Sequence, residues 1–287
     1  MAVVRSTGHA RKLVGPPIHS GSRNHGTSQD KGIMTVKRIL MALTAALVAS
    51  VIMTQPAGPG QVAEAASAVI TTPPSVTLAS ATYYNSRCGN TSGRVLLTFD
   101  DWAYGDPYRA TRTGAYLKSR GIRAAFFLIN EYARKYPGIV STLRKQGHWV
   151  LNHTYSHPDL TTLSSYNVAW QIRNGVHSNR LRPPGGAYNS RVSGVAATLG
   201  YRICTWTIDT RDWQYVNGSR RSVPSIRYIV RTSSYSAKSS GVILGHLFTN
   251  YPTALSGIIY DLHRQGFLFC RNRGPVGAFA PFPLACN

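Results

Sequence analysis

The chain has 287 residues, 43% of them apolar and 15% charged, with 32 Lys and Arg against 10 Asp and Glu. This length and apolar content allow one large domain or two small ones with a substantial core, which excludes a disordered chain. The basic residues are mostly arginines scattered singly along the sequence, so the charge does not indicate a nucleic-acid partner. It favours contact with an anionic surface such as a cell wall, or simply a soluble, arginine-rich composition.

The N-terminal region predicts export from the cell. Lys37 and Arg38 precede an apolar run at residues 39–53, and small-residue A-x-A cleavage sites follow, which is the order of a secretory signal peptide over residues 34–68. The run of about 15 residues is short for a membrane span, and an uncleaved signal anchor is the alternative. We expect a secreted protein, extracellular or associated with the cell wall, that has no membrane contact beyond its signal peptide.

Residues 1–33 are an unusual preface to a signal peptide, because they are polar and rich in Gly, Ser and His. We expect this upstream extension to be disordered and translation to start at Met34; a long n-region that starts at Met1 is the alternative. Without residues 1–68 the chain keeps 25 Lys and Arg and 8 Asp and Glu, a formal charge of +17.

The remaining sequence predicts one domain between two short flanking segments. Residues 69–93 are rich in Thr, Ser and Pro and predict a linker or strap, and residues 272–287 are expected to pack on the domain as a C-terminal tail. Strands are predicted at residues 95–99, 124–129, 148–151, 179–181, 201–208, 241–244 and 267–270. Helices are predicted at residues 106–120, 137–146, 164–174, 189–199, 224–233 and 252–265.

The alternation of strands and helices predicts parallel β/α units, in either a barrel or a doubly wound sheet. Seven strands rather than eight favour an α/β fold of the distorted, incomplete (β/α) barrel type, with about seven parallel strands. In both layouts the chemistry collects at the carboxyl ends of the strands, so polar residues at those ends are the candidates for a functional site.

The four cysteines, Cys88, Cys204, Cys270 and Cys286, all follow the predicted signal peptide. An exported chain with an even count and no C-x-x-C spacing favours disulfides over zinc thiolates. Three pairings are possible. We expect Cys88 to pair with Cys286 and Cys204 with Cys270; a buried free thiol at Cys204 is the alternative.

Two carboxylates follow the first predicted strand, and two histidines follow the third. Asp100 and Asp101 can serve a site or simply cap a turn. Adjacent residues are poor candidates for the acid and base of a glycosidase, which stand ~5 to 9 Å apart on opposing elements. With Asp101, the imidazoles of His153 and His157 can form a facial site for a divalent metal ion, with zinc as the expected ion.

The later strand ends carry further candidates. Arg182 opens the segment RPPGG and can hold a carboxylate, while Gly185 allows close approach of the backbone; an ordinary turn is the alternative. The fifth strand leads into DTRDW, which contains Asp212 and Trp213, and the sixth leads into LGH, which ends at His246.

These motifs together resemble a known family. The segments TFDD, HTYSH, RPPGG, DTRDW and LGH occur in the order and spacing of the polysaccharide deacetylases, the NodB homology group of carbohydrate esterases. The resemblance covers about residues 94–271. It implies a NodB-like fold, a hydrolase that acts on linear amides, and an N-acetylated polysaccharide as partner: N-acetylglucosamine units of peptidoglycan or a chitin-type glycan. We expect a monomer.

The resemblance also implies how the motif residues divide the reaction. Asp101, His153 and His157 match the metal ligands. Asp100 matches the general base, and Arg182 matches the arginine that orients this base. A metal ion held in this way would lower the pKa of bound water and polarise the acetyl carbonyl.

The remaining motif residues match the acid side of the site and its groove. His246 matches the general acid, and Asp212 matches the carboxylate that steers it. Trp213 and Leu244 match residues that shape the acetyl-binding groove, and a backbone N–H near Gly185 matches the oxyanion donor. The family usually has an aromatic residue where Gly185 stands, so the groove is expected to be wider here.

One residue of the first motif departs from the family, which usually has glycine where this chain has Trp102. Trp102 can offer a surface for sugar stacking or can pack as a large apolar residue. Two other functions remain as alternatives: an O-acetyl esterase that acts on acetylated xylan through the same site, and a non-catalytic glycan-binding protein.

Overall fold

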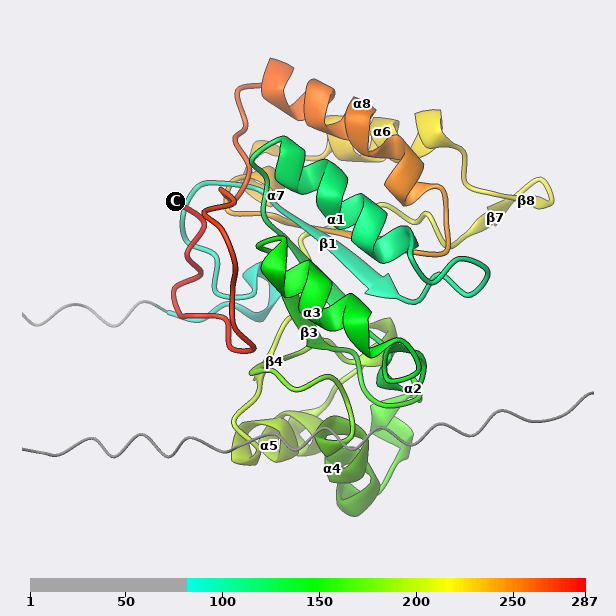
Figure 1. Cartoon of the computed structure of the whole chain (residues 1–287), viewed down its shortest axis with the longest axis vertical. Coiled ribbons are helices and arrows are strands. Elements are labelled where there is room, and N and C mark those ends of the chain that lie inside the picture. Colours follow the sequence, from blue (N-terminus) through cyan, green and yellow to red (C-terminus); the bar gives the residue numbers. More distant parts are fainter. Residues whose placement is uncertain (1–81) are drawn as a thin grey trace, which may run out of the picture. The chain divides into compact units, whose positions relative to one another are not determined.

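The computed structural model describes residues 82–287, which are built around one parallel sheet of seven strands (Figure 1). The predicted upstream extension, the signal peptide and most of the predicted linker lie outside these residues. The strand order is β5-β4-β3-β2-β1-β9-β6. The strands are β1 (Leu96–Asp101), β2 (Ala124–Leu128), β3 (Trp149–Asn152), β4 (Arg180–Leu181), β5 (Arg202–Ile203), β6 (Ile208–Asp209) and β9 (Val242–His246).

The connection between β5 and β6 shows why this sheet curls. These strands are consecutive in the chain but form the two opposite edges of the sheet. A flat sheet of seven strands would separate its edges by about 29 Å, whereas the five residue steps from Ile203 to Ile208 can span at most about 18 Å. The sheet must therefore curl into a half-barrel, which confirms the predicted incomplete barrel of parallel strands.

The prediction of the strands themselves was wrong in two places. The run at residues 201–208 was predicted as one strand, but it splits into β5 and β6 because Cys204 N–H still bonds to Leu181 on one edge, whereas Thr207 N–H already bonds to Val242 on the other. Residues 267–270 form no strand and contribute only an isolated bridge, Val95 to Phe269. The count of seven is reached with a different set of strands.

The six predicted helices are all present. They are α1 (Arg109–Ser119), α3 (Pro137–Lys145), α4 (Ser165–Arg173), α5 (Ser190–Thr198), α6 (Val223–Thr232) and α8 (Tyr251–Arg264). Capping residues fix their ends: the Asn189 side chain accepts the backbone N–H of Val192 at the start of α5, and Gly200, with a φ of 79°, follows its end. Within residues 82–287, none of the helices combines the length and apolar character that a membrane crossing needs.

Several short elements escaped prediction. They are the helices α2 (Asn130–Ala133) and α7 (Tyr235–Lys238), the antiparallel hairpin of β7 (Tyr215–Val216) and β8 (Ser219–Arg220), and the 3-10 turns Asn85–Arg87, Leu160–Thr162 and Pro184–Gly186. Each has only a few residues, too few for a hydrophobic period to show in the sequence.

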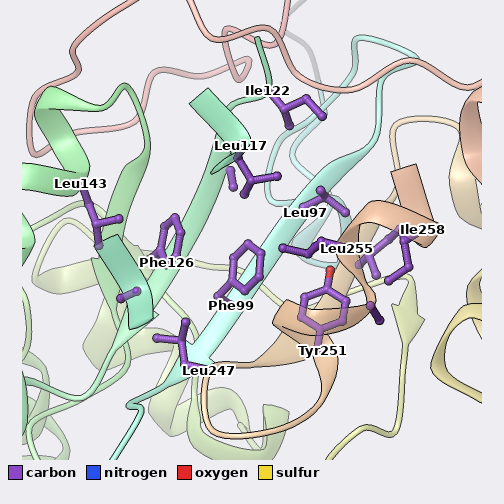
Figure 2. Close-up of a cluster of buried hydrophobic side chains, with 14 of the residues drawn as sticks. Leu97, Phe99, Leu117, Ile122, Phe126, Leu143, Leu247, Tyr251, Leu255 and Ile258 are labelled. Carbon is purple, nitrogen blue, oxygen red and sulfur yellow. The ribbon is translucent and has the colours of Figure 1, made fainter. Parts of the chain in front are cut away.

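The main core lies between the sheet and the helices that cover its outer side (Figure 2). All six residues of β1 are buried. The ring of Phe99 on β1 stacks on Phe126 of β2 at 4.8 Å and contacts Tyr251 of α8 at 5.2 Å. Because β1 is packed on both faces, its last two residues are presented from a rigid support.

The disulfides differ from the expected pairing. Cys88 bonds to Cys204, and Cys270 bonds to Cys286, so the expected pairs were wrong and Cys204 is not a free thiol. The curl of the sheet explains the first pair, because it brings the β5–β6 crossover against the 3-10 turn at Asn85, whose carbonyl accepts the Thr205 N–H at 2.9 Å.

The C-terminal residues lie along the same body. Val276 N–H bonds to the Arg144 carbonyl, and Ala280 exchanges two hydrogen bonds with the Asn179 side chain, each of 2.9 Å. These contacts attach the tail near the amino-terminal ends of β3 and β4, away from the strand ends that carry the candidate residues.

Candidate active site

The predicted site residues meet at the carboxyl ends of the strands. Asp100 and Asp101 end β1, and His246 ends β9, where it stands in register with Asp100. These residues line a cavity of about 330 Å³. The cavity is lined by Asp100, Asp101, His153, His157, Gly185, Trp206, Asp209, Trp213, Leu244, His246 and Phe248.

Three of these residues form a compact cluster of ligand atoms. Asp101 Oδ1 lies 3.2 Å from Nε2 of His153 and 3.2 Å from Nε2 of His157, and one ligand atom from each residue lies within 4.8 Å of the others. Asp101 and His157 both have left-handed backbone conformations, with φ of 68° and 64°. This conformation is unfavourable for residues other than glycine and is retained where function requires it.

The chemistry of this cluster fits a divalent metal ion. The backbone carbonyl of Arg182 accepts a hydrogen bond from Nδ1 of His153 at 2.7 Å, which leaves the lone pair of Nε2 directed toward Asp101. Asp101 Oδ1 is buried and accepts no hydrogen bond from the part of the chain that the structure describes. Buried carboxylate oxygens normally find a partner, so a carboxylate and two imidazole nitrogens left facing one another are a suitable set of ligands for zinc.

Beside this cluster, Asp100 is held by a buried arginine. Arg182 is fully buried and donates from Nη1 to Asp100 Oδ1 at 2.6 Å and to Thr98 Oγ1 at 2.8 Å. Its other nitrogens donate to the backbone carbonyls of Cys204 and Thr205. Burial lowers the pKa of Arg182, although Asp100 opposes this effect. Arg182 therefore fixes one oxygen of Asp100 and leaves the other facing the cavity.

On the adjacent strand β9, His246 is held by a second buried carboxylate. Asp212 Oδ1 lies 2.8 Å from Nδ1 of His246, and Asp212 Oδ2 accepts the backbone N–H of His246 at 2.8 Å and the hydroxyl of Thr249. Burial lowers the pKa of His246, but the hydrogen bond and charge of Asp212 outweigh burial and raise it to about 9. His246 is therefore protonated at neutral pH and presents Nε2 to the cavity.

The groove residues lie where they were predicted, together with three residues to which the sequence assigned no role. Gly185, with a φ of 60°, has open space where a Cβ would stand, and Trp213 is 45% exposed. The additional lining residues are Trp206, Asp209 and Phe248. Trp206 lies in the β5–β6 crossover, which the undivided prediction of residues 201–208 concealed, whereas Asp209 is the last residue of β6 and directly follows the predicted strand.

Among the predicted site residues, Arg182 and Asp212 lie behind the cavity and hold Asp100 and His246, whereas Trp102 neither lines the cavity nor holds a residue that does. Its side chain is 2% exposed and belongs to the main core. The indole stacks on the rings of Tyr132 and Tyr136, with centroid distances of 6.4 and 5.8 Å. A buried indole cannot stack on a sugar, so the packing alternative describes Trp102 and the sugar-stacking interpretation is withdrawn.

Comparison with known proteins agrees with this geometry. Residues 89–204 match the family model described as polysaccharide deacetylase. The peptidoglycan-N-acetylglucosamine deacetylase PgdA of Listeria monocytogenes is 29% identical over 62% of this chain, which spans 38% of that protein's length. A chitooligosaccharide deacetylase of Sinorhizobium fredii is 29% identical over 63% of this chain and 91% of its own length.

One solved structure is similar to this chain in both sequence and shape. The Bc1960 peptidoglycan N-acetylglucosamine deacetylase is 30% identical, and the match covers 63% of this chain and 86% of the other, with a TM-score of 0.55. The match covers most of that domain, and this chain presents the family's motif residues around one cavity. The chain therefore belongs to the polysaccharide deacetylase family.

Proposed function

We propose that the protein is a secreted, metal-dependent deacetylase that hydrolyses the N-acetyl groups of N-acetylglucosamine units in peptidoglycan or a chitin-type glycan. One observation carries the proposal. Asp100 and His246 stand in register on adjacent strands and line one cavity, and each is held by a buried partner of opposite charge, Arg182 and Asp212. A carboxylate base and an imidazolium acid that face one cavity are what the hydrolysis of an amide requires.

In the proposed mechanism, the residues divide the proton transfers. Asp101, His153 and His157 would hold a divalent cation, zinc in our proposal, which supplies Lewis acidity to polarise the acetyl carbonyl and acidify water. Asp100 accepts a proton from the attacking water through its free oxygen. His246 donates its Nε2 proton to the departing nitrogen, so the amide and one water become acetate and a free amine.

Three observations support the choice of substrate. The two curated relatives are named as deacetylases of peptidoglycan N-acetylglucosamine and of chitooligosaccharides. The chain after the predicted signal peptide has a formal charge of +17, which favours an anionic cell-wall polymer. Its two disulfides are typical of proteins that fold in an oxidising compartment.

An acetate-release assay on peptidoglycan, chitin oligomers and acetylxylan, with and without a chelator, tests the proposal. We expect acetate from one or both N-acetylated polymers, and at least a tenfold loss of activity after chelation. Faster release from acetylxylan would indicate an O-acetyl esterase. Binding of glycan by metal-loaded protein without any acetate release would indicate a non-catalytic function. N-terminal sequencing of the secreted product tests export and cleavage near residue 68.

The variant Asp100→Asn tests the assigned base. We expect it to retain bound metal and to lose at least about a thousandfold in kcat, because the amide cannot accept the proton of water. Metal content is measured by elemental analysis, and turnover by acetate release. His157→Ala is the matched variant and should lose tight metal binding. Full turnover by Asp100→Asn would place the base elsewhere.

A further inference from the structure

A second hollow adjoins the cavity on the side of His246. It has a volume of about 330 Å³ and is formed by residues 103–106, Arg109 and Phe248. Phe248 also lines the cavity that holds the candidate catalytic residues. The two hollows therefore share one wall, and a ligand too long for the first can continue into the second.

The shared wall consists of aromatic rings that are held in place. Phe248 contacts the ring of His246 at 5.6 Å and the ring of Tyr104 at 5.9 Å. The guanidinium group of Arg220, on the β7–β8 hairpin, lies over the ring of Phe248, 4.5 Å from its centroid. Tyr104 packs edge-on against Tyr132 at 5.0 Å, yet its side chain is 52% exposed.

An exposed ring with fixed neighbours is suited to ligand binding, because it offers apolar area at little cost in conformational entropy. Exposed tyrosines elsewhere on the surface, such as Tyr260, line neither hollow. The arrangement around Tyr104 and Phe248 is thus distinguished by its continuity with the catalytic cavity. We call these two residues the aromatic platform.

The direction of the reaction indicates which part of the substrate would reach the platform. In the proposed function, on which this step rests, His246 protonates the nitrogen that remains on the sugar. The acetyl group occupies the cavity, and the sugar that carries this nitrogen lies against His246, beside which Phe248 and then Tyr104 follow. A pyranose ring has apolar C–H faces that can stack on such rings.

We propose that the aromatic platform of Tyr104 and Phe248 binds the sugar unit next to the one that loses its acetyl group. The platform makes the enzyme prefer oligomers over single N-acetylglucosamine units. Neither residue transfers a proton, so the platform acts through substrate affinity rather than through the chemical step.

Binding of an N-acetylglucosamine tetramer to full-length protein tests the platform. The titration uses Asp100→Asn protein so that the ligand is not consumed. We expect Tyr104→Ala to raise the Kd by about fivefold, the effect of one lost aromatic contact. Tyr104→Phe should keep the Kd within about twofold, because stacking needs the ring and not the hydroxyl. Tyr260→Ala, which removes an exposed tyrosine that lines neither hollow, serves as the control and should have no effect.

Acetate release from the same tetramer separates this proposal from the proposed function. In protein that retains Asp100, Tyr104→Ala should raise KM with little change in kcat. If acetate is released and Tyr104→Ala matches Tyr260→Ala in both assays, the platform is refuted while the proposed function stands. If no acetate is released but tetramer binding still depends on Tyr104, the reaction is refuted and the platform stands. Absence of tetramer binding would also refute the platform.

Discussion

Asp100 and Asp101 are neighbours in the sequence, but their carboxylates have different partners. Asp101 faces the imidazoles of His153 and His157, whereas Asp100 is bonded to Arg182. Successive side chains of a regular strand point to opposite faces. The left-handed conformation of Asp101 departs from this rule at the last residue of β1, and so both carboxylates reach the same cavity.

The protonation state of His246 is set by Asp212, which leads to a prediction about pH. Because Asp212 raises the pKa of His246 to about 9, the acid form is present below pH 9 and is lost above it. Asp212→Asn removes the charge that raises this pKa. We expect the alkaline limit of kcat to move to lower pH by about one to two units. Acetate release measured from about pH 6 to pH 10 tests this.

Asp159→Asn provides the control for this experiment, since Asp159 is an exposed carboxylate that caps a 3-10 turn. An alkaline limit that is the same in Asp212→Asn, Asp159→Asn and the unaltered protein would show that another group supplies the proton.

At the scale of single residues, the sequence predicts the charged groups and the candidate metal ligands. It misses the uncharged side chains that hold these groups in place. Asp100, His153 and His246 stand in recognisable motifs after apolar runs. Thr98 opens the TFDD segment and Thr249 follows LGH, but neither was given a role, because their hydrogen bonds to Arg182 and Asp212 depend on how distant segments pack. Trp102 shows the converse error: a motif position suggested exposure, but neighbouring tyrosines bury it.

At the scale of elements, the packing of α8 against the end of β9 has little room to vary. Gly245, one residue before His246, lies directly against the ring of Tyr251, and a Cβ at this position would overlap the ring. Tyr251 itself is fully buried, and its hydroxyl has no hydrogen-bond partner among residues 82–287. The ring is therefore needed for packing, while the hydroxyl is a buried polar group without compensation.

This packing predicts opposite effects for two substitutions. Tyr251→Phe keeps the ring and removes the unpaired hydroxyl, so the free energy of unfolding should stay the same or rise by about 1 kcal/mol. Gly245→Ala forces the ring of Tyr251 away and should lower the free energy of unfolding by about 1 to 3 kcal/mol. Denaturant unfolding with intact disulfides measures both. If Tyr251→Phe lowers the free energy of unfolding by more than about 1 kcal/mol, the hydroxyl has a partner.

Elements defined by local patterns could be predicted, and those defined by distant contacts could not. The six longer helices follow from apolar spacing and caps such as Asn189. The division of residues 201–208 into β5 and β6 has no local signal, because these residues leave one strand partner, Leu181, for another, Val242, that lies far along the chain. The same curl explains why the cysteine pairing could not be read from the sequence.

At the scale of the whole molecule, the two disulfides join very different lengths of chain. Cys88–Cys204 closes 116 residues and attaches the segment before β1 to the β5–β6 crossover, whereas Cys270–Cys286 closes 16 residues within the C-terminal region. The first disulfide also contacts the site: Nη2 of Arg182 lies 3.5 Å from Cys204 Sγ and 4.0 Å from Cys88 Sγ. It thus forms part of the wall against which Arg182 is packed.

Removing the two disulfides separately should distinguish support of the fold from support of the site. By loop length, replacing both Cys88 and Cys204 with Ser should cost about 4.7 kcal/mol, and replacing both Cys270 and Cys286 about 3 kcal/mol. Both variants should lose thermal stability. Well below their unfolding temperatures, only the first should also lose about tenfold in kcat, because Arg182 would no longer hold Asp100 in one orientation.

The second double variant is the control, since within residues 82–287 its sulfur atoms make no hydrogen bond to a site residue, unlike those of Cys88 and Cys204. Circular dichroism and metal content show whether each variant remains folded and loaded before kcat is compared. Equal losses of kcat in the two variants would mean that the disulfides act only through stability. A loss confined to the first variant would show that the closure of the half-barrel, through Cys204 and Arg182, positions the base.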